Sequence, residues 1–203
     1  ALFNIDATTG AVTFKSSPNY EAPGDAGGNN VYDVTVTASD GTLSSTKDVP
    51  ITVSNVNEAP TITSAATASF AENGSGTVYT AAASDPDAGA TLTYSISGAD
   101  ASLFNIDATT GVVTFKSSPN FEAPGDAGGN NVYDVKVTAS DGTLSSSKDV
   151  AITVVNANDA PTASAVIANQ SINEDAGFSF AVPASSFADA DAGDSLTYSA
   201  SLA

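Results

Sequence analysis

A near-identical internal repeat constrains this chain more than any other feature. The ten residues ALFNIDATTG that begin at Ala1 return as SLFNIDATTG at Ser102, 101 residues later, and the match extends to Pro60 and Pro161. A third, more divergent copy then begins, with the motif LTYS at Leu92 repeated at Leu196. Self-similarity at a fixed period indicates an array of like units rather than one globular domain.

The repeat divides the chain into three parts. We predict the back part of one repeat at 1–57, a complete repeat at 58–159 and the front part of a third, divergent repeat at 160–203. Joining the end of the chain to its beginning nearly rebuilds the internal sequence LTYSISGADASLFNID. The chain ends therefore fall inside repeats rather than at their boundaries. Three explanations are open: the choice of fragment limits, an arbitrarily cut fibre unit, or a head-to-tail assembly in which partial repeats complete one another.

Composition excludes several classes of protein. The chain has no Cys and no His, which removes disulfides, thiolate metal sites and the usual general base. Five Lys against 23 Asp and Glu give a net charge of −18, which excludes non-specific nucleic-acid binding through basic patches. No run is apolar enough to span a bilayer, and the paired carboxylates lie at linkers, so we expect neither a membrane span nor an enzyme.

The periodicity throughout the complete repeat is that of β-strands. Residues rich in Val, Ile, Thr, Tyr and Phe fall in short segments separated by Gly, Asn, Asp and Pro, at Thr91–Ser97, Phe104–Ile106, Val112–Lys116, Val132–Ala139 and Leu144–Val155. Alternation is clearest where Tyr133, Val135, Val137 and Ala139 share one face. About seven strands in roughly 100 residues predict an all-β array of tandem immunoglobulin-like Greek-key sandwiches, with Phe104, Phe115 and Tyr133 in the core.

Two matching polar segments end the first two repeats, at Asn55–Pro60 and Asn156–Pro161. Each crowds side-chain oxygens into a few positions, and a proline prevents the strand from continuing. Such a segment is either a polar turn or a chain that wraps a hard cation between two β domains.

The order of motifs in the complete repeat resembles that of a cadherin domain. Six motifs carry the resemblance: AENGSG (Ala71–Gly76), SDPDAG (Ser84–Gly89), FNIDATTGVVTF (Phe104–Phe115), NFE (Asn120–Glu122), VYDVKVTASDG (Val132–Gly142) and NANDAP (Asn156–Pro161). The third copy resembles the dystroglycan-type cadherin-like variant of bacterial surface proteins. The low complexity and high repeat identity are similar to those of bacterial repeat-type adhesins.

The resemblance implies a calcium cluster at each junction between repeats. At the first junction the implied ligands are Asn19, Glu21, Asn55, Asn57, Glu58, Asp85, Asp87 and Asp141. At the second they are Glu72, Asn120, Glu122, Asn156, Asn158, Asp159, Asp189 and Asp191. Calcium prefers six to eight oxygen ligands, and gathering this many carboxylates without a cation would cost several kcal/mol.

Four positions depart from the cadherin pattern. Asn replaces the usual Asp at 19, 55, 120 and 156, which removes a charge and keeps an oxygen. We therefore predict that the outermost calcium is the weakest or missing, leaving two or three ions per junction. A further loop at Pro23–Asn30, repeated at Pro124–Asn131, is either a plain surface loop or a site where Asp25 or Asp126 holds another cation.

These features predict calcium-rigidified extender or adhesion repeats of a large bacterial extracellular protein. Calcium ions and neighbouring repeats of the same chain are the expected partners. Two alternatives stay open: a module that binds glycans or like repeats, and a segment of an extracellular filament whose neighbouring subunits complete one another's domains.

Overall fold

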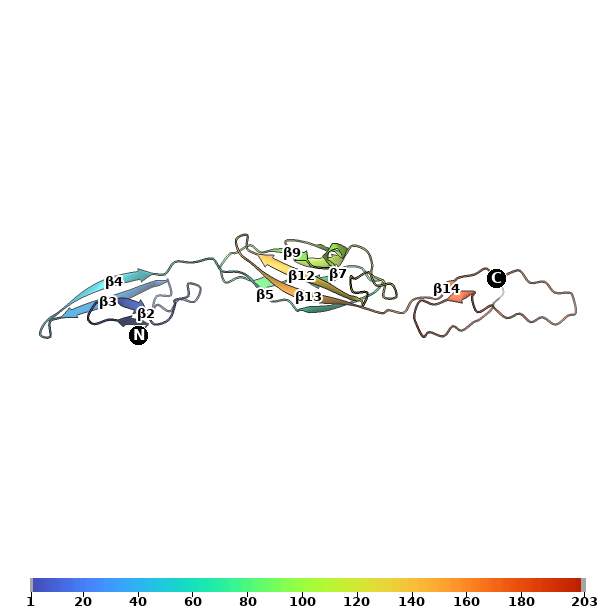
Figure 1. Ribbon diagram of the computed structural model, residues 1–203, viewed down its shortest axis with the longest axis horizontal. Helices are drawn as coiled ribbons and strands as arrows, with labels where there is room; N and C mark the ends of the chain where they lie inside the picture. The colour runs from blue at the N-terminus through green and yellow to red at the C-terminus, as the bar shows by residue number, and fades with distance from the viewer. Residues whose placement is uncertain (1, 202–203) are drawn as a thin grey trace.

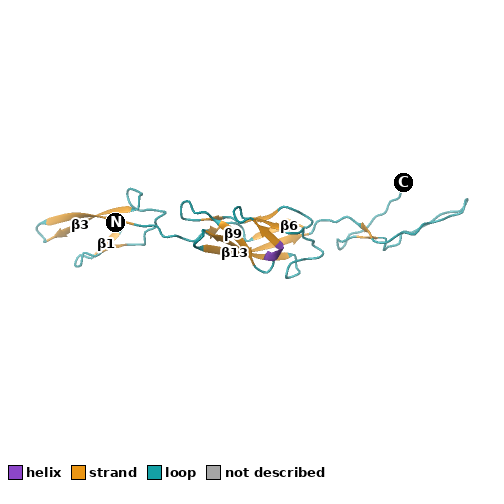
Figure 2. Cartoon of the chain, turned by 90° about the horizontal axis from the view of Figure 1, so that it is seen from above, coloured by secondary structure: helices purple, strands orange, loops and turns teal. Residues whose placement is uncertain are grey.

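The computed structural model describes residues 2–201 as three β-rich parts in a row along one long axis (Figure 1). Residues 2–57 lie at one end, the central repeat lies in the middle and residues 160–201 lie at the other end. Strands and loops account for nearly all of the described residues, and η1 (Ala101–Leu103) is the single 3-10 helix among them (Figure 2). The predicted all-β class is confirmed.

The central repeat is a sandwich built from two main sheets. One has the order β6-β13-β12-β9, with β6 (Thr67–Ala71), β9 (Thr93–Ser97), β12 (Val132–Ser140) and β13 (Ser145–Val155). The other has the order β10-β11-β7, with β7 (Thr77–Thr80), β10 (Phe104–Ile106) and β11 (Val112–Phe115). A short pair, β5 (Thr61–Ile62) and β8 (Ala83–Ser84), closes the end that faces the first linker.

The core of this sandwich follows the predicted alternation. Tyr133, Val135, Val137 and Ala139 of β12 are at most 3% exposed, whereas Asp134 and Lys136 between them face solvent. On β13, Val150, Ile152 and Val154 are likewise buried, and this strand pairs with β12 over nine residue positions. Phe104 is also buried and Phe115 packs against the same cluster. Because successive strand residues point to opposite faces, one register puts all of these side chains inside.

Residues 2–57 form only the strands that belong to the back part of a repeat. These are β1 (Phe3–Ile5), β2 (Val12–Phe14), β3 (Val31–Ser39) and β4 (Ser44–Thr52). The β1–β2 and β3–β4 pairs keep the registers of β10–β11 and β12–β13, shifted by 101 residues. Within the described residues, however, neither pair gains a further strand.

Residues 160–201 contain one short antiparallel pair, β14 (Thr162–Ala163) and β15 (Phe187–Ala188). This pair corresponds to β5–β8 of the central repeat, and Ser164 donates to the Ser186 carbonyl as Thr63 donates to that of Ala82. The remainder is irregular and mostly exposed. In the central repeat, β6 pairs with β13 and β9 pairs with β12. The segments of residues 160–201 that correspond to β6 and β9 have no such partner strands among the described residues. No helix in residues 2–201 is long and apolar enough to cross a membrane.

Candidate metal centres at the two junctions

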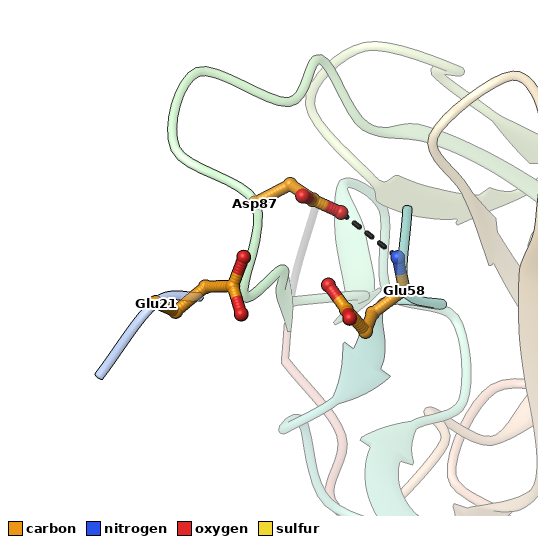
Figure 3. A group of neighbouring side chains, drawn as sticks. All are labelled: Glu21, Glu58 and Asp87. Carbon is orange, nitrogen blue, oxygen red and sulfur yellow. Dashed lines mark hydrogen bonds between the residues drawn. The ribbon is translucent and has the colours of Figure 1, made fainter. Parts of the chain in front are cut away.

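Three carboxylates from separate parts of the chain meet at the first junction. Glu21 follows β2, Glu58 lies in the linker after β4, and Asp87 lies in the turn after β8. Their nearest ligand oxygens all lie within 4.8 Å of one another, and the side chains point toward a common centre (Figure 3). The sequence predicted all three, and the fold brings them together across the boundary between the first two parts.

Backbone contacts fix the positions of these side chains. The Glu58 N–H donates to Asp87 Oδ2 at 2.9 Å, which ties the linker to the turn of the central repeat. The Asp87 N–H in turn donates to Asp85 Oδ1 at 2.9 Å, so Asp85-Pro86-Asp87 is a turn closed by its first carboxylate. The same turn thus places the Asp87 carboxylate in the cluster.

Three carboxylate oxygens at this junction are buried without a hydrogen-bond partner: Glu21 Oε1, Glu58 Oε2 and Asp85 Oδ2. Burial raises the pKa of Glu58, and the charges of Glu21, Asp87 and Asp85 raise it further. A buried charge without a partner is costly, so the arrangement is electrostatically incomplete. A cation at the common centre would complete it.

Two asparagines extend the first cluster. Asn55 Nδ2 donates to Asp87 Oδ1 at 2.6 Å, and Asn57 Nδ2 donates to Asp141 Oδ2 at 2.8 Å. Asp141 also closes the β12–β13 hairpin by accepting the Thr143 and Leu144 N–H groups, and these bonds lower its pKa. One carboxylate thus serves both the hairpin and the linker.

The second junction is built around Glu72, Glu122 and Asp191, whose ligand oxygens also lie within 4.8 Å of one another. Glu72 is 2% exposed and accepts the N–H groups of Phe121 at 2.8 Å and Ala157 at 2.9 Å. These bonds lower the pKa of Glu72, whereas burial and the neighbouring charges of Glu72 and Asp191 raise that of Glu122. The buried Glu72 stays charged and holds the linker in place.

The third repeat contributes its aspartates to the same site. The Asp159 N–H donates to Asp191 Oδ2 at 2.6 Å, and the Asp191 N–H donates to Asp189 Oδ1 at 3.1 Å. These bonds repeat the arrangement of Glu58, Asp87 and Asp85 at the first junction. Asn158 Nδ2 donates to the Asp159 carbonyl at 2.8 Å, while Asn156 is exposed beside it.

Two residues at the second junction were not predicted from the sequence. Asn73 adopts a positive φ of 56° and its Nδ2 donates to Asp159 Oδ1 at 2.8 Å. Asp194 groups with Asp189 and Asp191 within 4.8 Å. The Asn-Gly pair after Glu72 was the available signal for Asn73, because Asn and Gly tolerate this backbone conformation.

Asn19 and Asn120 lie in local turns. The N–H of Ala22 donates to Asn19 Oδ1 at 3.0 Å, and that of Ala123 donates to Asn120 Oδ1 at 2.6 Å. The extra loop is likewise closed by its own aspartate, because both oxygens of Asp126 accept loop N–H groups from Asn130 and Asn131. Asp25 does the same at the earlier copy. These bonds favour a plain surface loop.

Comparison with known proteins identifies the fold. No protein-family model matches the chain, and no curated protein matches it. Among solved structures it is similar to human CDH23 EC21-23 (21% identity, TM-score 0.59, 95% of this chain and 62% of that one). It is also similar to mouse cadherin-23 EC22-24 (24%, 0.54, 77% and 50%) and to the protocadherin gammaB4 extracellular domain (26%, 0.52, 79% and 27%).

These similarities show that the fold is a cadherin-like β-sandwich of the immunoglobulin type. They support the sequence resemblance at the level of the domain. The chain spans about half the length of the mouse cadherin-23 structure, so it covers only part of that protein.

Proposed function

We propose that this chain is a set of calcium-rigidified, cadherin-like extender repeats of a large bacterial extracellular protein, with Ca²⁺ bound at the junctions between repeats. The observation that carries the proposal is the set of buried, unpartnered carboxylate oxygens of Glu21, Glu58 and Asp85 at one junction. In a chain with a net charge of −18 and five lysines, a cation from solution is the natural partner for them.

The donor set fits calcium better than other divalent ions. It consists of carboxylate, amide and carbonyl oxygens, which are the ligands of a hard cation, and zinc would require His or Cys that the chain does not contain. Magnesium prefers strict octahedral geometry and its own waters, whereas calcium accepts six to eight oxygens in irregular shells. Asn55 and Asn57 would present Oδ1 to the ion after a 180° rotation of the amide.

Calcium at these sites would stiffen the array because the ligands come from both sides of each junction. Glu21 belongs to the first part and Asp87 to the second, so an ion between them fixes the two parts relative to each other. Without the ion the same carboxylates repel, and the junction loosens. This chain has Asn where cadherins have Asp at positions 19, 55, 120 and 156. The outermost calcium is therefore bound most weakly or is missing, which leaves two or three ions per junction.

The wider setting follows from the same features. We assign repeats to residues 1–57, 58–159 and 160–203, with each junction shared by adjacent repeats. A rigid array of this kind would project an adhesive domain from a bacterial surface, with calcium and neighbouring repeats as its partners. The extracellular domain of protocadherin gammaB4, similar in fold, supports an extracellular location.

Calorimetric titration of the chain with calcium and with magnesium tests the proposal. Glu58→Gln keeps the size of the side chain and removes a charge, so calcium affinity at the first junction should fall about 10- to 100-fold. Asp159→Asn should do the same at the second junction. Asp33→Asn is the matched control, because it removes one charge from an exposed position on β3 and should leave binding unchanged. Unchanged stoichiometry and affinity in both junction variants would refute the assignment.

X-ray scattering tests the mechanical consequence separately. The maximum dimension of the chain should be long and well defined in calcium and shorter or more variable in chelator. An identical scattering curve under both conditions would remove the rigid-rod mechanism even if calcium binds.

A further inference from the structure

One buried asparagine lies close to the metal-binding glutamate in each of the first two parts of the chain. Asn30 and Asn131 are 9% and 8% exposed, although amide side chains are mostly exposed in proteins. Asn30 Nδ2 donates to the Tyr20 carbonyl at 2.9 Å, and Asn131 Nδ2 donates to the Phe121 carbonyl at 2.8 Å. Each of these carbonyls belongs to the peptide unit that leads directly into the glutamate. The bond therefore fixes the peptide plane next to the metal-binding residue.

The backbone of this asparagine is held from two sides. Asn131 adopts a positive φ of 61°, a conformation that Asn tolerates better than most residues. Its N–H donates to Asp126 Oδ1 at 2.9 Å, and its carbonyl accepts the Val154 N–H at 2.8 Å. The side chain therefore has a fixed position relative to β13, the strand that runs into the second linker.

Asn30 repeats these contacts in the first part of the chain. Its φ is 60°, its N–H donates to Asp25 Oδ1 at 3.0 Å, and its carbonyl accepts the Val53 N–H at 2.9 Å. All of these bonds lie within the back half of the repeat, so both copies form them. Glu21, placed in this way, points toward the other two carboxylates of the first junction (Figure 3).

At the second junction both polar groups of the Phe121 backbone are held. Its N–H donates to Glu72 Oε2 at 2.8 Å, and its carbonyl accepts from Asn131. The next residue, Glu122, has a carboxylate oxygen within 4.8 Å of those of Glu72 and Asp191. One ligand of the candidate metal centre thus holds the Phe121 N–H, and a residue outside the ligand set holds its carbonyl.

The side chain of Asn131 makes this one hydrogen bond among the described residues, although an amide offers two donors and two acceptor lone pairs. Its Oδ1 is buried without a hydrogen-bond partner there, and the same is true of Asn30. A buried polar atom without a partner costs stability, so stabilisation of the fold does not by itself explain this amide. What the two copies share is the bond to the residue before the glutamate.

We propose that Asn30 and Asn131 are positioning residues for the calcium centres. Each orients the peptide before its glutamate so that the carboxylate faces the junction rather than solvent. The inference rests on the proposed calcium function and adds a determinant of affinity that lies outside the ligand set. Because each asparagine holds the glutamate of its own repeat, Asn30 acts on the first junction and Asn131 acts on the second.

Asn131→Gly tests the inference, because glycine adopts the same positive φ and lacks the amide. Calcium affinity at the second junction should fall about 10-fold, the loss expected when a residue that orients a metal ligand is removed. Calcium affinity at the first junction should stay unchanged. Calorimetric titration in the Glu58→Gln background isolates the second junction, and titration in the Asp159→Asn background isolates the first.

Asn131→Asp separates positioning from charge. Aspartate tolerates the same φ, but an ionised carboxylate has no hydrogen to donate to the Phe121 carbonyl. An added negative charge by itself would strengthen the binding of a nearby cation, whereas loss of the donor weakens it. We expect calcium affinity at the second junction to fall in this variant. A rise in affinity would overturn the proposal.

Asn130→Gly is the matched control. Asn130 is the exposed neighbour of Asn131, and its Oδ1 accepts the Val132 N–H at 2.9 Å. It makes no bond to the glutamate-bearing segment among the described residues, so calcium affinity at both junctions should be unchanged. A merely structural role for Asn131 would weaken both junctions, because the central repeat supplies Asp87 to the first and Glu72 to the second. Equal losses at the two junctions in Asn131→Gly would therefore overturn the proposal.

Asn30→Gly repeats the test in the first part of the chain, and its effect should be confined to the first junction. This variant decides the question if Asn131→Gly prevents the central repeat from folding. An unsubstituted chain that binds no calcium would refute the proposed function and this inference with it. Calcium binding that Asn30→Gly and Asn131→Gly leave unchanged would refute the inference alone and leave the junction sites intact.

Discussion

Residues 2–57 and 103–158 have nearly the same sequence and differ in what covers them. Tyr32 and Tyr133 are both buried, at 5% and 2% exposure. Val49 and Val150 differ by far more, at 40% and 1%. The same local sequence therefore produces one set of side chains that is buried in both copies and another that is buried only in the complete repeat.

The aromatic side chains belong to the first set because their partners lie within the back half. Phe3, Phe14 and Tyr32 have ring centroids 4.4–5.9 Å apart, and Phe104, Phe115 and Tyr133 have centroids 4.3–5.9 Å apart. The tyrosine hydroxyl accepts the N–H of Gly24 in one copy and of Gly125 in the other. The aliphatic face on β3 and β4 depends instead on strands from the front half. Among the described residues, the hairpins and the aromatic cluster of the first copy are therefore formed by contacts within the back half alone.

The largest expected difference between the two copies is at this aliphatic core. Ile152→Ala should lower the free energy of unfolding of the central repeat by about 2–5 kcal/mol, because Ile152 is fully buried. Ile51→Ala, at the corresponding half-buried position on β4, should lower the free energy of unfolding much less. Urea unfolding at low protein concentration measures both. Equal losses would mean that the first part is as fully packed as the central repeat.

A smaller difference is expected at a pair of glycines with the same backbone conformation. Gly10 and Gly111 both have φ +71°, so alanine at either position costs about 1–2 kcal/mol in the left-handed region. At Gly111 an added Cβ would also lie 2.4 Å from the carbonyl oxygen of Ala81, the residue after β7. At Gly10 no atom would lie within 4 Å of an added Cβ.

Gly111→Ala should therefore lower the unfolding midpoint more than Gly10→Ala. It would also disturb the bond from the Ala81 N–H to the Gly111 carbonyl, which is 2.9 Å long. Thermal unfolding of the two variants checks the order. A larger effect at Gly10 would contradict the packing difference between the copies.

The smallest expected effect is on how the free energy of unfolding depends on pH in the absence of calcium. Burial and neighbouring charges raise the pKa of Glu58 above its ordinary value of 4.5, so the folded chain holds this proton more tightly than the unfolded chain. Above the raised pKa, Glu58 is ionised in the folded chain, and its buried charge lowers the stability of the fold by the full amount. It is relieved as the pH falls through that value toward 4.5, and stability should rise in this window.

Unfolding in chelator as a function of pH measures this effect, with Glu58→Gln as the variant that should flatten the rise. The pKa of Glu122 at the second junction is also raised. Glu72 shifts in the opposite direction, and its stabilising contribution is lost only as the pH falls below 4.5 through its lowered pKa. A stability that fell steadily from neutral pH to 4.5 would contradict the raised values.

Much of the fold could be read from the sequence because strand periodicity and repetition are local properties. The alternation along Val132–Ala139 placed Tyr133, Val135 and Val137 inside, and the structure confirms it. The strand limits shifted only slightly: β9 begins at Thr93 rather than Thr91, and β13 begins at Ser145 rather than Leu144. The motifs also named Glu21, Glu58 and Asp87, which the fold gathers at one junction.

Only the tertiary structure decided how these residues are used. It placed Asn73 against Asp159, although the two are 86 positions apart, and it directed Asn19 and Asn120 into local turns. It also left carboxylate oxygens buried and unpartnered at one junction and exposed in one copy the aliphatic face that the other covers. The physical reason is that burial and charge clustering depend on segments distant in the chain. The sequence by itself determined strands, faces and ligand types, and the packing of one repeat against the next determined which of them meet.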